Sequence, residues 1–213
     1  MNNFHKAIIG LLALFFGISV YFYFMLPDTI ITHWGIDGQP NGWAGSAEGL
    51  FILPVVSLVI IVLFRLFASI DPIASTNPRF HRLFDWFSIY FVGFMLYLQI
   101  WVIAANSGVA VNMNQVLAPA MAVLFYSVGA LIENAPRNWF MGIRTPWTIS
   151  SDTVWIKTNR LGGKVFKIFG ILCLPGIFFE FPFIVWAVLG LATASLWLVA
   201  YSYLEFRREK KRS

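Results

Sequence analysis

Residues 50–70 read LFILPVVSLVIIVLFRLFASI, and this stretch decides the fold class. It is almost continuously apolar, and its one charged residue, Arg65, stands near its end. About 20 consecutive apolar residues are enough for an α-helix to cross the hydrocarbon core of a bilayer. The stretch therefore predicts a transmembrane helix.

Further apolar runs of similar character lie on both sides of this one. They extend from Ile8 to Leu26, Trp86 to Ala105, Gln115 to Ile132, Val165 to Phe179 and Phe183 to Leu204. The run that begins at Val165 is the shortest, about 22 Å as a helix, and it contains Pro175. Lys167 near its start can extend toward the headgroups, so the run is still counted as a span. The sequence predicts an all-α polytopic membrane protein with six transmembrane helices.

The distribution of charge predicts the orientation. Thirteen of the fifteen Lys and Arg residues fall in alternate connections and the two ends of the chain, and the other two, Arg65 and Lys167, lie near the ends of runs on that same side. Segments 27–49, 106–114 and 180–182 contain none. Because basic residues are retained on the cytoplasmic side, both termini are predicted to be cytoplasmic. The net charge of +5 is explained by this topology and by attraction to anionic lipid headgroups, so direct nucleic-acid binding is not expected.

With 59% hydrophobic and 12% charged residues, the chain has little material for a soluble domain. Residues 1–213 are predicted to form one integral membrane domain. Its amino-terminal helical hairpin covers residues 1–70 with an ordered outer loop at 27–49. A four-helix part covers residues 84–204 with an inner loop at 133–164.

The outer loop, residues 27–49, is rich in glycine and holds two prolines and two tryptophans. Gln39-Pro40-Asn41-Gly42 is typical of a type I turn. His33 and Trp34, with the neighbouring acids Asp28 and Asp37, raise the alternative of a metal site. The other two histidines are predicted on the opposite side of the membrane, so we expect no metal and no cofactor, and we expect the tryptophans to anchor the loop at the headgroups.

The inner loop, residues 133–164, contains the sharpest local pattern, Gly142-Ile143-Arg144-Thr145-Pro146-Trp147. Arg144 offers a rigid fork of donors to a carboxylate or phosphate, and Pro146 restrains Thr145 to an extended conformation. Ser150 or Ser151 followed by Asp152 then predicts a helix start. We expect a cytoplasmic interfacial helix up to Leu161, with Trp155 at the headgroup level, that Gly162-Gly163 ends or bends.

Catalysis and ion transport inside the membrane would place ionisable residues well within the spans. Arg65, Asp85, Glu133 and Lys167 all lie near predicted cytoplasmic ends. The middle of the bundle offers only hydroxyl and amide groups, those of Ser57, Gln99, Ser127, Thr193 and Ser195. We therefore expect a protein that is not an enzyme. The enzyme alternative would need Glu133, Arg144 and Asp152 to meet in one cleft.

Residues 142–164, GIRTPWTISSDTVWIKTNRLGGK, resemble the signature of the SdpI family of bacterial membrane proteins. The signature runs Gly-Ile/Leu-Arg-Thr-Pro-Trp-Thr and continues through a Trp and an Asn-Arg pair, here Trp155, Asn159 and Arg160. Residues 26–43 resemble the amino-terminal domain of unknown function that occurs in these proteins. The resemblance implies that the SdpI part and this amino-terminal domain together cover nearly the whole chain.

The resemblance implies a multi-pass protein of the bacterial plasma membrane that gives immunity to a secreted, membrane-active peptide toxin and that also senses it. The implied partners are the lipid bilayer, a peptide toxin outside and a cytoplasmic repressor inside. The residues proposed for partner contact or signalling are His33, Trp34, Gly142, Arg144, Thr145, Pro146, Trp147, Trp155, Asn159 and Arg160. The alternative function is a small transporter or exporter of an apolar or peptidic solute, which predicts that Gln99 and the mid-membrane hydroxyl groups face a common cavity.

Overall fold

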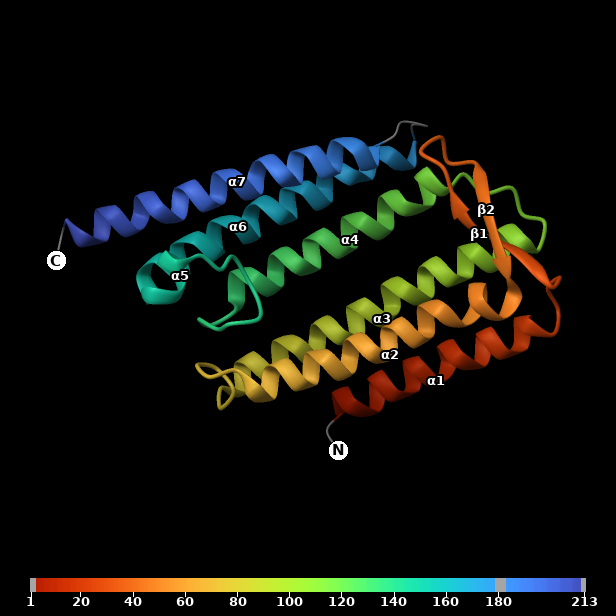
Figure 1. The fold of residues 1–213 in the computed structure, drawn as a ribbon, viewed down its shortest axis with the longest axis horizontal. Helices are drawn as coiled ribbons and strands as arrows, with labels where there is room; N and C mark the ends of the chain where they lie inside the picture. The colour runs from red at the N-terminus through yellow and green to blue at the C-terminus, as the bar shows by residue number, and fades with distance from the viewer. Residues whose placement is uncertain (1–2, 179–182, 212–213) are drawn as a thin grey trace.

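The computed structural model describes residues 3–178 and 183–211, and long helices dominate it (Figure 1). They are α1 (Asn3–Tyr23), α2 (Ser46–Ile70), α3 (Pro78–Asn106), α4 (Met113–Asn134), α6 (Asp152–Cys173) and α7 (Phe183–Lys210). Successive long helices run in opposite directions, so the chain passes back and forth along one axis. This arrangement agrees with the predicted all-α polytopic membrane protein.

Within the described residues, five helices are long and apolar enough to cross a membrane: α1, α2, α3, α4 and residues 188–210 of α7. The remaining long helix, α6, begins with a polar half and continues as an apolar half that ends in a short 3-10 helix, Leu174–Ile177. Both chain ends lie at the same end of the bundle in Figure 1. Assignment of that end to the cytoplasm stays a prediction.

The starts of three helices follow from side-chain caps. Asn77 accepts hydrogen bonds from the backbone of α3, with Pro78 as the first helical residue. Asn112 caps α4 and Ser151 caps α6 in the same way. Each side chain satisfies a backbone N–H that has no partner inside its helix, which fixes where the helix begins.

The core between α1, α2 and α3 is made of apolar side chains at helical spacing. Ile8 and Phe15 of α1 meet Ile61 of α2 and Val92 of α3, and all four are buried. Around them, many large apolar side chains of the same helices remain exposed, among them Val62, which is 56% exposed. An exposed apolar surface on long apolar helices suits lipid as the surrounding solvent.

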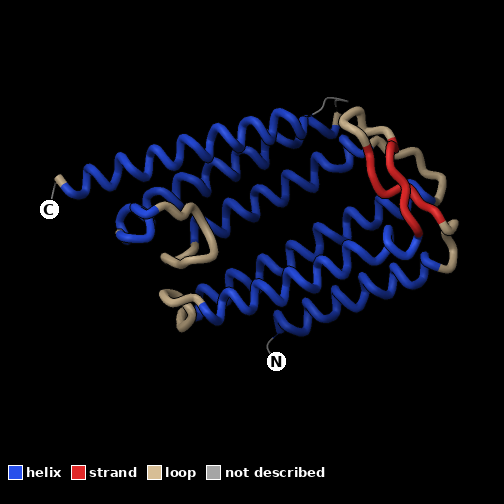
Figure 2. The backbone as a smooth tube through the Cα atoms, in the orientation of Figure 1, coloured by secondary structure: helices blue, strands red, loops and turns tan. Residues whose placement is uncertain are grey.

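The outer loop is a two-stranded antiparallel hairpin, shown in red in Figure 2, formed by β1 (Thr29–Trp34) and β2 (Pro40–Gly45). The predicted type I turn at 39–42 was wrong. The chain reverses at 35–39 instead, where Gly38 N–H donates to Gly35 O at 2.9 Å and Gly38 has a φ of 77°. Pro40, which has no N–H, starts the second strand, a position where the missing donor costs little.

The predicted interfacial helix is part of a longer helix, because α6 continues through Gly162 and Gly163 without a break. A Cβ atom on Gly163 would lie 2.6 Å from Gly129 O and 2.5 Å from Glu133 Cβ of α4. Gly163 therefore allows α4 and α6 to approach closely, as small residues do between membrane helices. A Cβ atom on Gly162 would instead overlap Ile143 Cδ1 and lie 3.5 Å from Leu198 Cδ1 of α7, so this glycine allows close packing on the inner loop and α7. The expectation that the two glycines end or bend the helix was wrong for these reasons.

The first half of α6 packs against protein rather than lying flat on lipid. Since Gly163 lies opposite the last turns of α4, residues 152–162 extend beyond the end of that helix. They run beside the last turns of α7, where Lys157 Nζ pairs with Glu205 at 2.7 Å. Trp155 is 1% exposed, so its predicted place at the headgroup level was also wrong.

Candidate functional site

The inner connection from α4 to α6 carries most of the predicted site residues, and a buried asparagine shapes its first turn. Asn138 Oδ1 accepts hydrogen bonds from the N–H groups of Phe140 and Met141, at 2.9 and 2.6 Å. Its Nδ2 donates to the carbonyls of Pro136 and Met141, at 2.8 and 2.9 Å. Asn138 is fully buried, so one side chain fixes residues 136–141 as a compact turn.

A buried carboxylate ties this turn to another connection at the same end of the bundle. Asp71, which follows α2 and is 1% exposed, accepts a hydrogen bond from Trp139 N–H at 2.7 Å. Its other oxygen accepts from the N–H groups of Ile73 and Ala74, at 2.9 and 2.7 Å. The carboxylate thereby holds the loop after α4 against the loop after α2.

Asn159 and Trp155 of α6 hold the next part of the connection. Asn159 Oδ1 accepts from Ile143 N–H at 2.7 Å, and Trp155 Nε1 donates to Ala135 O at 3.0 Å. Gly142 has a φ of 109°, and a Cβ atom there would lie 2.5 Å from Asn159 Oδ1. A glycine is required here by both the backbone conformation and the space.

The Thr-Pro pair of the signature begins a short helix, α5 (Pro146–Ser150). Thr145 is its N-cap and exchanges hydrogen bonds with Thr148 in a capping box, while Pro146 occupies the first turn. Thr145 Oγ1 also lies 3.1 Å from Ser202 Oγ of α7. The signature therefore fixes a helix start against the last part of α7.

Arg144 is the exposed member of this assembly. Its guanidinium donates to the carbonyl of Trp139, which is its one hydrogen-bond partner among the described residues. Beside it, Trp147 packs on Tyr203 of α7 with ring centroids 5.0 Å apart. An open groove of about 610 Å³ is lined by Trp139, Arg144, Thr145, Pro146, Ile149 and Ser150. An unneutralised guanidinium next to apolar surface can bind a carboxylate or phosphate of a partner that also brings an apolar group.

The residues of the enzyme alternative do not meet in one cleft. Glu133 pairs with Lys167 of α6, and Asp152 pairs with Arg137 Nε at 2.8 Å. Arg144 instead faces the groove beside α5. Each acid is held in its own ion pair, so the three side chains do not form a shared site.

The outer hairpin caps the opposite end of the bundle, and amide side chains fasten it (Figure 1). Asn106, the last residue of α3, accepts from Ile31 N–H at 2.7 Å and donates to Ile31 O at 3.0 Å. Asn114 of α4 donates to Ile36 O at 2.9 Å. Ile30 is 1% exposed and packs with Leu50 in the core below. The hairpin is thus an ordered part of the bundle.

Of the two outer site residues, His33 is exposed and hydrogen-bonds Asn41 across the hairpin, while Trp34 is half-buried. Trp43 and Ile36 are 59% and 61% exposed. The hairpin therefore presents apolar surface outward.

The predicted site residues form two groups at opposite ends of the molecule. The inner group brings together Gly142, Trp155 and Asn159 as supports, whereas Arg160 is exposed on α6. Sequence reasoning missed Asn138 and Asp71, which position the inner group. Asp71 is followed by Pro72, a pair that marks a turn, but nothing local indicates the distant loop that it holds.

The transporter alternative predicts that the polar groups of the bundle face a common cavity, and the structure does not bring them together in this way. The hydroxyls of Ser57, Thr193 and Ser195 donate to carbonyls four residues earlier in their own helices. Gln99 is fully buried in α3, whereas Thr193 and Ser195 are exposed on α7. This removes the structural support for a transport pathway through these groups.

Comparison with known proteins matches residues 134–202 to the SdpI/YfhL protein family. Residues 10–58 match a domain of unknown function, DUF1648. Immunity protein SdpI of Bacillus subtilis (strain 168) is 27% identical over 197 residues, which cover 91% of this chain and 92% of that protein. No solved structure matches the chain. The resemblance drawn from the Gly142–Lys164 segment is confirmed.

Proposed function

We propose that this chain, a multi-pass plasma-membrane protein of the SdpI/YfhL family, gives its cell immunity to a secreted, membrane-active peptide toxin and signals its presence. The proposal rests on one observation above others. The family match falls on residues 134–202, and in this region buried side chains hold an exposed arginine beside an open groove. Such rigid support of an exposed group is expected where a partner binds.

The outer hairpin supplies a surface for the toxin. Segment 27–49 contains no Lys or Arg but carries Asp28, Asp37 and Glu48, and the hairpin exposes Trp43 and Ile36. An acidic and apolar surface attracts a cationic, apolar peptide and can contact it before it inserts into the bilayer. Because the hairpin is fastened to α3 and α4, contact there acts on the bundle itself.

The inner groove supplies a surface for a cytoplasmic partner. Arg144 has donors left for a carboxylate, and Trp139 and Ile149 offer apolar contact beside it. The last turns of α7, with Arg207, Arg208 and Lys210, add positive charge nearby. A partner with an acidic and apolar segment fits this surface, and a repressor held at the membrane would be one such partner.

Survival of a sensitive bacterium that expresses the protein tests immunity. Cells with the wild type and with Arg144→Ala are challenged with a panel of secreted peptide toxins, at equal abundance in the membrane. Lys164→Ala is the matched control, because Lys164 is also an exposed basic residue but lies outside the groove. We expect protection by the wild type and the control and loss of protection by Arg144→Ala. No protection by wild-type protein against any toxin would overturn the proposal.

The proposed action is binding without catalysis. Toxin incubated with vesicles that contain the protein should be recovered with unchanged mass. Toxin fragments or a modified toxin, formed only with the protein present, would show that an enzyme is at work.

A further inference from the structure

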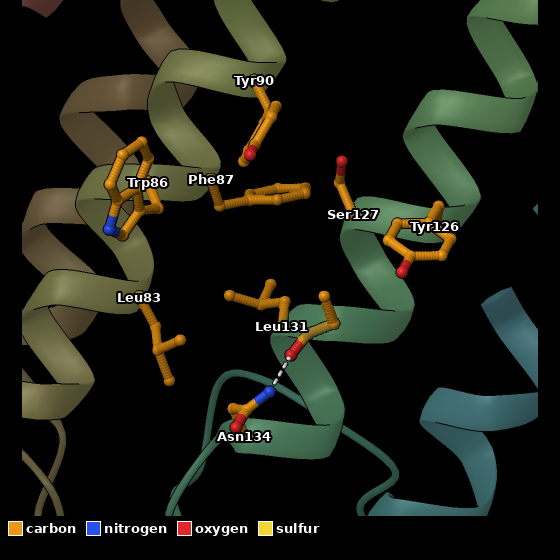
Figure 3. A pocket seen from close by; sticks show the side chains of 9 residues that line it. Leu83, Trp86, Phe87, Tyr90, Tyr126, Ser127, Leu131 and Asn134 are labelled. Carbon is orange, nitrogen blue, oxygen red and sulfur yellow. Dashed lines mark hydrogen bonds between the residues drawn. The ribbon is translucent and has the colours of Figure 1, made fainter.

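A groove of about 320 Å³ lies between α3 and α4, toward the end of the bundle that carries both termini. Figure 3 shows its walls, with Leu83, Trp86 and Phe87 on α3 facing Leu131 on α4. Ala130 lines it beside Leu131 and leaves the space between the two helices open. The groove is separate from the inner groove at Arg144 and from the outer hairpin.

The groove opens to the lipid side of the bundle. Trp86 is 47% exposed and Tyr90 is 49% exposed, and both belong to α3, which is long and apolar enough to cross a membrane. From Leu83 to Tyr90 the groove follows α3 for about 10 Å at 1.5 Å per residue. An apolar channel of this length, open to the bilayer, suits a segment of an acyl chain.

Positive charge gathers where the groove ends. Arg79 and Arg82 are exposed on α3 and stand four residues before Leu83 and Trp86, which places them on the stripe of the helix that lines the groove. Arg79 Nη2 donates to Asn134 Oδ1 of α4 at 2.9 Å, so its guanidinium reaches across the mouth.

These two arginines differ from their basic neighbours, Arg65 and Lys167, whose charges are neutralised by carboxylates. Arg65 pairs with Asp85 at 2.7 Å, and Lys167 pairs with Glu133. Neither Arg79 nor Arg82 forms an ion pair with a carboxylate in the part of the chain that the structure describes. Their charge is left for an anion from outside the chain.

We propose that the groove binds one anionic phospholipid, with an acyl chain between α3 and α4 and its phosphate at Arg79 and Arg82. The planar guanidinium matches a phosphate, and basic pockets between membrane helices are suited to anionic headgroups. The bound lipid joins the amino-terminal helices to the part of the chain that carries the inner loop.

The arginines set the preference for an anionic headgroup, whereas the groove sets the affinity for the chain. One basic residue near an anionic surface contributes on the order of fivefold in binding. Loss of both arginines should therefore lower the preference for phosphatidylglycerol over phosphatidylcholine by about 20- to 30-fold.

Native mass spectrometry of the purified full chain in detergent measures this preference. The protein is titrated with dioleoyl phosphatidylglycerol or dioleoyl phosphatidylcholine, and the bound fraction is compared. Arg79→Gln/Arg82→Gln removes the headgroup contacts, and its control, Lys164→Gln/Lys211→Gln, removes the same charge elsewhere on the exposed surface. Circular dichroism verifies that each variant keeps its helices.

A second pair of variants tests the groove itself. Ala130→Trp fills it, and Val62→Trp places the same side chain on the exposed surface of α2. We expect tight binding of phosphatidylglycerol by the wild type and both controls, lost preference in the arginine variant and weaker binding of both lipids in Ala130→Trp. Equal binding of the two lipids by the wild type, or unchanged lipid binding in both Arg79→Gln/Arg82→Gln and Ala130→Trp, would overturn the proposal. A dimer that Ala130→Trp abolishes while lipid binding persists would assign the groove to a second copy of the chain instead.

Discussion

Substitution of Gly142 by alanine is the sharpest perturbation of the inner loop. Its φ of 109° disfavours any residue with a Cβ atom, and that atom would lie 2.5 Å from Asn159 Oδ1. Asn159 cannot yield freely, because it is 1% exposed and the same oxygen accepts from Ile143 N–H at 2.7 Å. The new methyl group therefore breaks the hydrogen bond that fixes the residue before Arg144.

Substitutions at two other glycines separate the backbone cost of Gly142→Ala from the cost of its lost hydrogen bond. Gly108 also has a positive φ, 92°, but a Cβ atom there meets open space, so Gly108→Ala carries the backbone cost of about 1–2 kcal/mol alone. Gly142→Ala adds the loss of the half-buried hydrogen bond of Ile143 N–H, about 1–3 kcal/mol, for a total of about 2–5 kcal/mol. Gly93 lies in α3 with open space around it and no positive φ, so Gly93→Ala should cost nothing.

Unfolding in mixed micelles of mild and denaturing detergent gives the relative free energies of the three variants. Limited trypsin cleavage after Arg144 measures separately whether the loop has lost its fixed conformation. Only Gly142→Ala should expose the Arg144–Thr145 peptide bond to the protease. The reasoning is refuted if Gly142→Ala is no less stable than Gly108→Ala and is cut by trypsin no faster than the wild type.

Three further predictions concern other parts of the molecule. Gly163→Ala should lower the unfolding free energy by about 1–3 kcal/mol, because its Cβ atom would force apart the backbones of α6 and α4. Glu133→Gln and Lys167→Met should each destabilise, and a double-mutant cycle in the same micelles should give a coupling of about 0.5–3 kcal/mol; strict additivity would rule out the ion pair. Because the single native cysteine is buried, an impermeant maleimide applied to intact cells should label Asp37→Cys but not Ser150→Cys, and the reverse pattern would invert the topology.

The helices and their alternation could be predicted from sequence because hydropathy is a local property of each segment. The run at Leu50–Ile70 gives α2, which ends at the same residue. The start of α6 at Asp152 also agrees with its cap, Ser151. These signals depend on one stretch of chain and its solvent.

The errors arose where contacts distant in sequence decide the outcome. Gly162-Gly163 resembles a helix end, yet both glycines lie inside α6, where Gly163 allows close packing on α4 and Gly162 allows close packing on Ile143 and Leu198. Trp155 resembles an interfacial anchor, yet its Nε1 donates to Ala135 O in the interior. Asp71 accepts a hydrogen bond from the N–H of Trp139, which lies 68 residues away in the sequence. No local pattern shows that pairing.

The central claim is that the fixed inner loop is required for protection against a peptide toxin. It is tested most directly by the survival of toxin-challenged cells that express Gly142→Ala or Gly108→Ala at equal abundance in the membrane. Both substitutions strain the backbone, but only the first displaces Asn159 and the loop. The account predicts that Gly108→Ala protects as the wild type does and that Gly142→Ala does not. Full protection by Gly142→Ala would contradict it.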